Sequence, residues 1–132
     1  MSYFPESISP KPMNPEVKRQ WLEALRSGEY EQGQRRLRTG IKGSSLYCCL
    51  GVLCDLHSKA TGEAWSEPDG TPYLYRDCDV DLPFCVNQWA GIGYDKMENI
   101  ESKVCLLESV LADANDSGAD FPTIANWIED NL

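Results

Sequence analysis

The stretch SSLYCCLGVLCDLHS, residues 44–58, holds three of the six cysteines of the chain and its only histidine. When the stretch is wound as a helix, four side chains share one face, within about 40° of one another: Leu46, Leu50, Leu53 and His57. One apolar face of this kind is typical of a helix that packs on a core. The pattern predicts a helix over about residues 45–61, ended by Gly62.

The cysteines of this helix suit a buried position. Cys49 and Cys54 fall beside the apolar face, whereas Cys48, Gly51 and Asp55 fall on the far side. A free cysteine behaves as a small hydrophobic residue and is often buried. We therefore interpret the helix as a core element in which sulfur atoms fill the interior. The histidine then requires a hydrogen-bond partner inside the protein or a place at the rim of the core.

Two chemical alternatives use the same side chains. Cys54 and His57 are three residues apart and could share a zinc ion, but no second close pair of ligands follows. Cys48 or Cys49 could be a nucleophile at the start of the helix, but the histidine lies more than two turns away. Packing is favoured, with no metal and no cofactor. A small thiol- or metal-dependent enzyme or ligand-binding protein centred on these four residues is the alternative.

The start of the chain suggests a reducing environment. It lacks a basic segment followed by an apolar one, so no signal peptide is expected. No run of eighteen apolar residues occurs that could span a membrane. Thiols stay reduced inside a cell, and we expect six free cysteines: Cys48, Cys49, Cys54, Cys78, Cys85 and Cys105.

The segment before the cysteine helix predicts a leader and one further helix. Residues 1–14 contain three prolines and are expected to form a flexible leader, followed by a single globular domain over residues 15–132. Asn14 can cap a helix that ends at Gly28. Its apolar face consists of Val17, Trp21, Ala24 and Leu25. Residues 29–43 are expected to be loop or a short strand.

The segment after the cysteine helix predicts a hairpin and three more helices. The turn signal at residues 67–70 predicts a small β-hairpin between Trp65 and Tyr75. A short helix runs from near Pro83 to Gly91, and a longer one is marked by Ile100, Val104, Leu107 and Leu111. The last helix is capped by Asp120 and has an apolar face of Phe121, Ile124, Ala125, Ile128 and Leu132. The fold class is mostly helical α+β, with about five helices around one core and a small hairpin.

The charge of the chain is uneven, and the net charge is -9. Residues 1–43 carry eight basic and five acidic side chains, whereas residues 44–132 carry four basic and sixteen acidic ones. A surface that binds duplex DNA needs cations along the phosphates, so the acidic part disfavours nucleic acid as a partner. It could instead present carboxylates to a basic partner.

Two charged segments are candidate binding residues. The segment RRLRTGIKG contains Arg35, Arg36, Arg38 and Lys42, which could bind an anion or nucleic acid; the favoured reading is that they pair with acidic side chains of the same protein. The segment DCDVDLP contains Asp77, Asp79 and Asp81, which would face one way on a strand. It begins like a calcium-binding loop, but Leu82 and Gln88 stand where that loop requires glycine and glutamate.

Four stretches carry a resemblance that covers the chain from about Pro15 to Glu129: WLEALRSGEYEQG, YCCLGVLCDL, LP..V..WAG and NDSGADFPTIANWIE. Together they resemble a group of small proteins encoded by tailed bacteriophages and prophages. The resemblance implies no catalytic residues. It implies a protein in the cytoplasm of an infected host, with an accessory role such as modulating a host or defence protein.

The function hypothesis combines these observations. No stretch supplies a complete set of catalytic groups, and the acidic part offers a surface for a partner. We expect a non-enzymatic phage accessory protein that binds a host or phage protein through an acidic and aromatic surface. Of four tryptophans, most are expected in the core, and any exposed one would mark the binding face.

Overall fold

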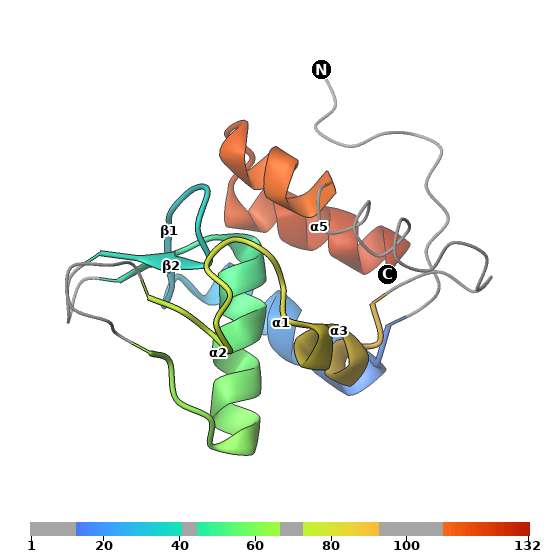
Figure 1. Cartoon of the computed structure of the whole chain (residues 1–132). Helices are drawn as coiled ribbons and strands as arrows, with labels where there is room; N and C mark the ends of the chain where they lie inside the picture. The colour runs from blue at the N-terminus through green and yellow to red at the C-terminus, as the bar shows by residue number, and fades with distance from the viewer. Residues whose placement is uncertain (1–12, 41–44, 67–72, 93–109) are drawn as a thin grey trace.

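The structure is a computed structural model of the chain that describes residues 13–40, 45–66, 73–92 and 110–132. Its elements are α1 (Pro15–Ser27), β1 (Glu31–Gln32), β2 (Arg38–Thr39), β3 (Leu46–Tyr47), α2 (Cys49–Thr61), α3 (Phe84–Ala90) and α5 (Phe121–Asn131). A further helical stretch covers residues 110–116. Figure 1 shows α2 between the small sheet and α3. The predicted class, mostly helical α+β, is confirmed.

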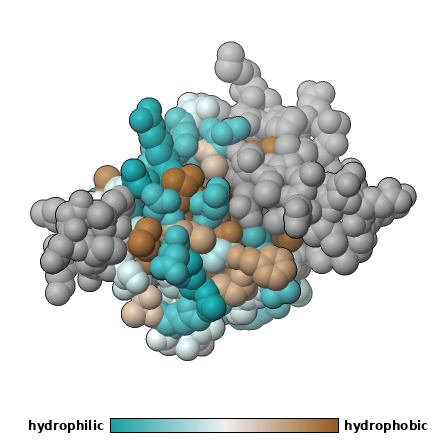
Figure 2. Space-filling view, viewed as in Figure 1, coloured by the Kyte–Doolittle hydropathy of each residue, from teal (hydrophilic) through white to brown (hydrophobic). Residues whose placement is uncertain are grey.

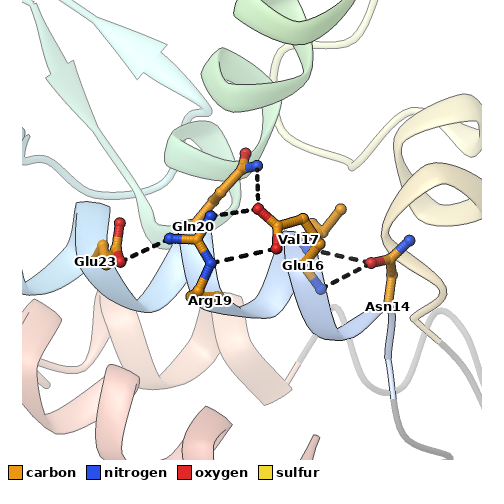
Figure 3. A network of polar contacts seen from close by, with 6 residues as sticks. All are labelled: Asn14, Glu16, Val17, Arg19, Gln20 and Glu23. Carbon is orange, nitrogen blue, oxygen red and sulfur yellow. Dashed lines mark hydrogen bonds and ion pairs between the residues drawn. The ribbon is translucent and has the colours of Figure 1, made fainter.

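The start of α1 is fixed by local hydrogen bonds. The Asn14 Oδ1 atom accepts from the backbone N–H groups of Glu16 and Val17, at 3.0 and 3.3 Å, as a capping asparagine does. Arg19 pairs with Glu16 and, at 2.8 Å, with Glu23 on the solvent face (Figure 3). Exposed pairs of this kind contribute little to stability, so the cap and the inner face define the helix.

The inner face of α1 packs on α5 and α2. The four predicted apolar residues of α1 are all buried, and so is the predicted apolar face of α5. Trp21 is fully buried, and its indole N–H donates to the backbone oxygen of Cys49 at 3.0 Å. Arg26 pairs with Glu129 at 2.6 Å on the outside of the α1–α5 contact. The predicted cap of α5 is confirmed, since Asp120 Oδ1 accepts from Thr123 N at 3.0 Å.

A three-stranded sheet stands where the sequence predicted loop or a short strand, over residues 29–43, and the start of a helix. The strand order is β1-β3-β2, with β3 parallel to β1 and antiparallel to β2. Leu46 and Tyr47 are therefore strand residues, and α2 begins at Cys49 rather than near Ser45. The prediction failed there because both residues form ladder hydrogen bonds to distant strands, which overrides their helical spacing.

Gly51 and Cys48 are buried, whereas the helical wheel placed both on the far side of α2. The carbonyl oxygen of Leu37 lies against Gly51, and a Cβ atom built there would be 1.7 Å from it. The same oxygen accepts from Cys48 N at 3.3 Å. Leu37 itself is fully buried. The segment before β2 thus covers the face of α2 that was expected to meet solvent.

Asn115 joins the sheet to the last two helices. Its side chain is fully buried. The Oδ1 atom accepts from Gln32 Nε2 at 2.9 Å and from Cys49 N at 3.2 Å, and Nδ2 donates to the Gly33 oxygen at 2.8 Å. Gln32 Oε1 in turn accepts from Phe121 N at 3.1 Å. These bonds set the position of β1 and α2 relative to α5.

The predicted hairpin is represented by two isolated β-bridges. Ser66 pairs with Leu74, on either side of the predicted turn at residues 67–70, which lies outside the described residues. Tyr75 then pairs with Cys78 around Arg76 and Asp77, which have φ angles of 49° and 67°. Two successive left-handed residues close a two-residue hairpin turn of the primed kind.

The body includes two residues that the sequence assigned to the leader. Met13 is 3% exposed, and its N–H donates to the Leu132 oxygen at 3.0 Å. The Asn14 N–H donates to the Ala90 oxygen at 2.9 Å. Residues 1–12, and the part of the predicted 100–111 helix that precedes residue 110, lie outside the described residues. No helix within the described ranges is long and apolar enough to cross a membrane.

Candidate functional site

The three thiols of the cysteine stretch are buried. Cys48 is 4% exposed, and Cys49 and Cys54 are fully buried. Burial raises the pKa of Cys48 to about 11 and raises the pKa of Cys49 well above its usual value. The thiol of Cys49 lies 3.5 Å from the Leu111 carbonyl oxygen. A reactive cysteine needs access and a stable thiolate; Cys48 and Cys49 offer neither, and Cys54 is buried without access.

His57 has its hydrogen-bond partner inside the protein. Its Nδ1 atom lies 2.5 Å from the hydroxyl oxygen of Tyr75. The imidazole edge also meets Trp89, with ring centroids 5.2 Å apart. Burial lowers the pKa of His57 and raises the pKa of Tyr75 to about 12. This pair is therefore neutral at physiological pH and is part of the aromatic packing against α2.

The chemical alternative requires a metal or a nucleophile among these residues. Within residues 13–40, 45–66, 73–92 and 110–132, no three His, Cys, Asp or Glu side chains are grouped so that they could hold a metal ion. Five cysteines of these ranges are free thiols: Cys48, Cys49, Cys54, Cys78 and Cys85. Cys105 lies outside them.

Thiol reactivity is expected to divide by burial. At pH 8, a thiol with a pKa near 11 is about one part in a thousand thiolate. Cys48 has such a pKa, and Cys48, Cys49 and Cys54 are all buried, so they should resist an aromatic disulfide reagent in the folded protein, whereas the half-buried Cys78 and Cys85 are modified. Mass mapping of the labelled peptides checks this, with protein unfolded in urea as the control for full reaction. Fast labelling of Cys48 or Cys49 in the native protein would revive the thiol-enzyme hypothesis.

The candidate arginines have three different environments. Arg35 is exposed, with a φ of 74°, and its N–H donates to Asp116 Oδ1 at 2.7 Å. Arg36 pairs with Asp79 at 2.6 Å, which is the pairing with the acidic part that the sequence favoured. Arg38 lies over the ring of Tyr73, with its Cζ atom 3.9 Å from the centroid. Lys42 lies outside the described residues.

The candidate aspartates follow a tight turn, and the prediction that they share one strand face is wrong. Asp77 is the second left-handed residue of the Tyr75–Cys78 turn, and residues 79–81 form a bend. The carbonyl of Asp79 accepts from Leu37 N at 2.7 Å, and its carboxylate pairs with Arg36. Asp81 is exposed. The turn overrides the alternating pattern, but the structure does bring the arginine and aspartate segments side by side.

The same segment exposes two apolar side chains that sequence reasoning did not single out. Val80 is 45% exposed and Phe84 is 70% exposed, and they are the exposed large hydrophobic residues of the described chain. Residues 77–84, here called the 77–84 surface, thus combine three carboxylates with two apolar groups. On the face seen in Figure 2, apolar areas are small and alternate with polar ones. The signal available in the sequence was Pro83, which starts α3 with Phe84 as its first residue.

A half-buried carboxylate on α2 was also missed. Asp55 Oδ2 accepts from the Tyr30 hydroxyl at 2.5 Å, and Oδ1 accepts from Trp65 Nε1 at 3.0 Å. Lys59 lies 3.4 Å from the same carboxylate. Burial, followed by the hydrogen bond to Asp55, raises the pKa of Tyr30. Because both carboxylate oxygens have donors, this group ties two loops to α2 rather than offering a base to a substrate.

Comparison with known proteins gives one match and no characterised relative. A family model described as "Domain of unknown function (DUF8296)" matches residues 13–132. No curated protein and no solved structure is similar enough to the chain to count as a match. The matched range begins at Met13, the residue with which the described body begins.

Proposed function

The chain belongs to the family described as "Domain of unknown function (DUF8296)", and because that description states no activity, we propose a function from the surface of the protein. The protein is a non-enzymatic phage accessory protein that acts in the host cytoplasm. It binds a host or phage protein through the 77–84 surface and thereby modulates that protein. The observation that carries the proposal is the exposure of Val80 and Phe84 among three aspartates.

The composition of this surface defines the partner. An exposed phenylalanine surrounded by polar groups can anchor an interface, because aromatic side chains that become desolvated contribute much of the binding energy. Asp79 is paired with Arg36, but the exposed Asp77 and Asp81 favour a basic segment around the partner's apolar pocket and increase the association rate. We therefore expect a partner segment that combines lysine or arginine with a pocket for an aromatic ring.

The backbone beneath the surface is held in place, which lowers the entropy cost of binding. Leu37 N donates to the Asp79 oxygen at 2.7 Å, and Tyr75 and Cys78 exchange two backbone hydrogen bonds of 2.9 Å. On the other side, Phe84 belongs to α3, whose Val86 and Ala90 are fully buried. The exposed groups are thus presented from a fixed frame.

A site-specific cross-link tests the proposal. A photoreactive phenylalanine analogue at position 84 should capture one bacterial or phage protein in infected cells. The matched control carries the same analogue at Asp130, an exposed position on α5. The captured protein is then purified, and its affinity for the wild-type chain and for variants is measured.

Phe84→Ser is expected to weaken that affinity at least about tenfold, as loss of a central aromatic anchor does. The fold should remain, since Phe84 is 70% exposed. The double variant Asp77→Asn, Asp81→Asn, which removes the charges and keeps a residue that tolerates the left-handed φ at position 77, should slow association and reduce its dependence on salt. The same cross-linked product from positions 84 and 130, or an affinity that Phe84→Ser leaves unchanged, would contradict the proposal.

A further inference from the structure

Arg38 differs from most arginines of this protein in what holds its guanidinium group. Four arginines direct a terminal nitrogen at a carboxylate in an ion pair: Arg19, Arg26, Arg36 and Arg76. The Cζ atom of Arg38 instead lies 3.9, 5.3 and 5.4 Å from the ring centroids of Tyr73, Tyr47 and Trp65. In a chain with 21 acidic and 12 basic side chains, an arginine kept on aromatic rings points to a role other than internal pairing.

The rings and one hydrogen bond fix the orientation of this group. Arg38 Nε donates to Ser45 Oγ at 2.9 Å. A guanidinium has five N–H donors in one plane, so stacking occupies its face and Ser45 occupies one donor. The two terminal nitrogens have no hydrogen-bond partner within the residues that the structure describes. The terminal nitrogens form the edge of the guanidinium that binds oxyanions with two parallel hydrogen bonds. In Arg38 this edge is fixed in orientation and has no acceptor among the described residues.

We infer that Arg38 is the centre of an anion-binding site and that its ligand is a phosphate group. A stacked and hydrogen-bonded guanidinium has already lost much of its side-chain freedom, so less entropy is lost on binding. The terminal nitrogens then donate to two phosphate oxygens. The rings of Tyr47 and Trp65 are only half-buried and border the position where the ligand would lie.

The surrounding charges favour a dianion over a single carboxylate. Arg35 is exposed and lies three residues away, at most about 10 Å along the chain, which is close to the screening length at physiological salt, about 8 Å. Arg36 is neutralised by Asp79, and Asp55, which bonds Trp65, is paired with Lys59. Arg35 and Arg38 thus both place positive charge near the site, offset in part at Arg35 by the Asp116 carboxylate that accepts from its N–H.

Titration with inorganic phosphate tests this inference on the full chain labelled with nitrogen-15. At constant ionic strength, the Nε–Hε signal of Arg38 and the backbone amide of Ser45 are expected to shift and saturate. Arg38→Lys keeps the charge but loses the pair of parallel N–H donors, and it should weaken binding at least about tenfold. Arg26→Lys is the matched control at a remote ion pair, and it should leave the affinity unchanged. Ser45→Ala, which removes the acceptor of Nε, should weaken binding severalfold.

A titration with acetate is the second part of the test, because a carboxylate would accept from the same two terminal nitrogens of Arg38. Acetate should bind more weakly than phosphate. Shifts of equal size at all arginines, an equal loss in Arg26→Lys, or acetate that saturates as readily as phosphate would each overturn the inference. The result is independent of the proposed function, since none of these variants changes the 77–84 surface.

Discussion

Gly51→Ala is expected to prevent the chain from holding its native fold. The new Cβ atom would be 1.7 Å from the Leu37 carbonyl oxygen and 2.6 Å from its carbonyl carbon. These are backbone atoms, so no side chain can rotate away. Leu37 cannot shift easily, because its N–H bonds to Asp79, its oxygen accepts from Cys48 N, and its side chain is fully buried. We expect a loss of more than about 4 kcal/mol in the free energy of unfolding, a large part of the 5–15 kcal/mol (roughly) that stabilises a typical domain.

Urea unfolding followed by circular dichroism measures this loss. Local helix propensity predicts the opposite sign, since alanine is favoured over glycine by about 1 kcal/mol inside a helix. Gly28→Ala is the matched control, because no atom lies within 4 Å of the new Cβ and only the φ of 78° is unfavourable. That variant should lose about 1 kcal/mol. If Gly51→Ala were as stable as the wild-type chain, the contact between Leu37 and α2 described above would be wrong.

Asn115→Leu should lower the free energy of unfolding by about 3–5 kcal/mol, because it leaves several buried polar groups without partners. The leucine has a similar volume, but it cannot accept from Cys49 N or Gln32 Nε2, nor donate to the Gly33 oxygen. The first turn of α2 and the end of β1 would both lose a hydrogen bond. The free energy of unfolding in urea is the measurement.

Two further variants test whether the loss arises from the hydrogen bonds of Asn115. Asn115→Asp keeps the shape and the acceptor but loses the donor to Gly33, so it should be less stable at neutral pH than at acid pH, where a protonated carboxyl can donate. Asn126→Leu is the control on an exposed position that accepts only from Arg26, and it should change stability by less than about 0.5 kcal/mol. Equal losses at both asparagines would argue against Asn115 as the joint between sheet and helices.

The parts of the fold that could be predicted are those whose cause is local. Asn14 and Asp120 cap their helices through backbone groups two or three residues away. The apolar faces of α1 and α5 repeat at helical spacing, so both were read correctly from the sequence. The burial of Cys49 and Cys54 followed from the same reasoning.

The parts that could not be predicted depend on contacts between distant residues. Strands of two residues are too short to show an alternating pattern, so the sequence left residues 29–43 as loop or a short strand and read the residues of β3 as helix. Gln32 and Asn115 are 83 positions apart. The two candidate binding segments were recognised by their charges, but their contacts, between Arg36 and the Asp79 carboxylate and between Leu37 N and the Asp79 oxygen, appear only in the structure. Phe84 reads as an apolar helix residue, and Pro83 before it marks where α3 begins but not which way the Phe84 side chain faces.

The hydrogen bond from Met13 N to the Leu132 oxygen, at 3.0 Å, brings the first and last residues of the described body together. A circular permutant is therefore feasible: a short linker would join residue 132 to residue 13, and new ends would be opened in the exposed turn at Gly28 and Glu29. Such a rearranged gene would place α1 last and β1 first while each helix kept its neighbours. Comparing the permutant with the wild-type chain would therefore change the order in which these elements are synthesised without changing how they pack.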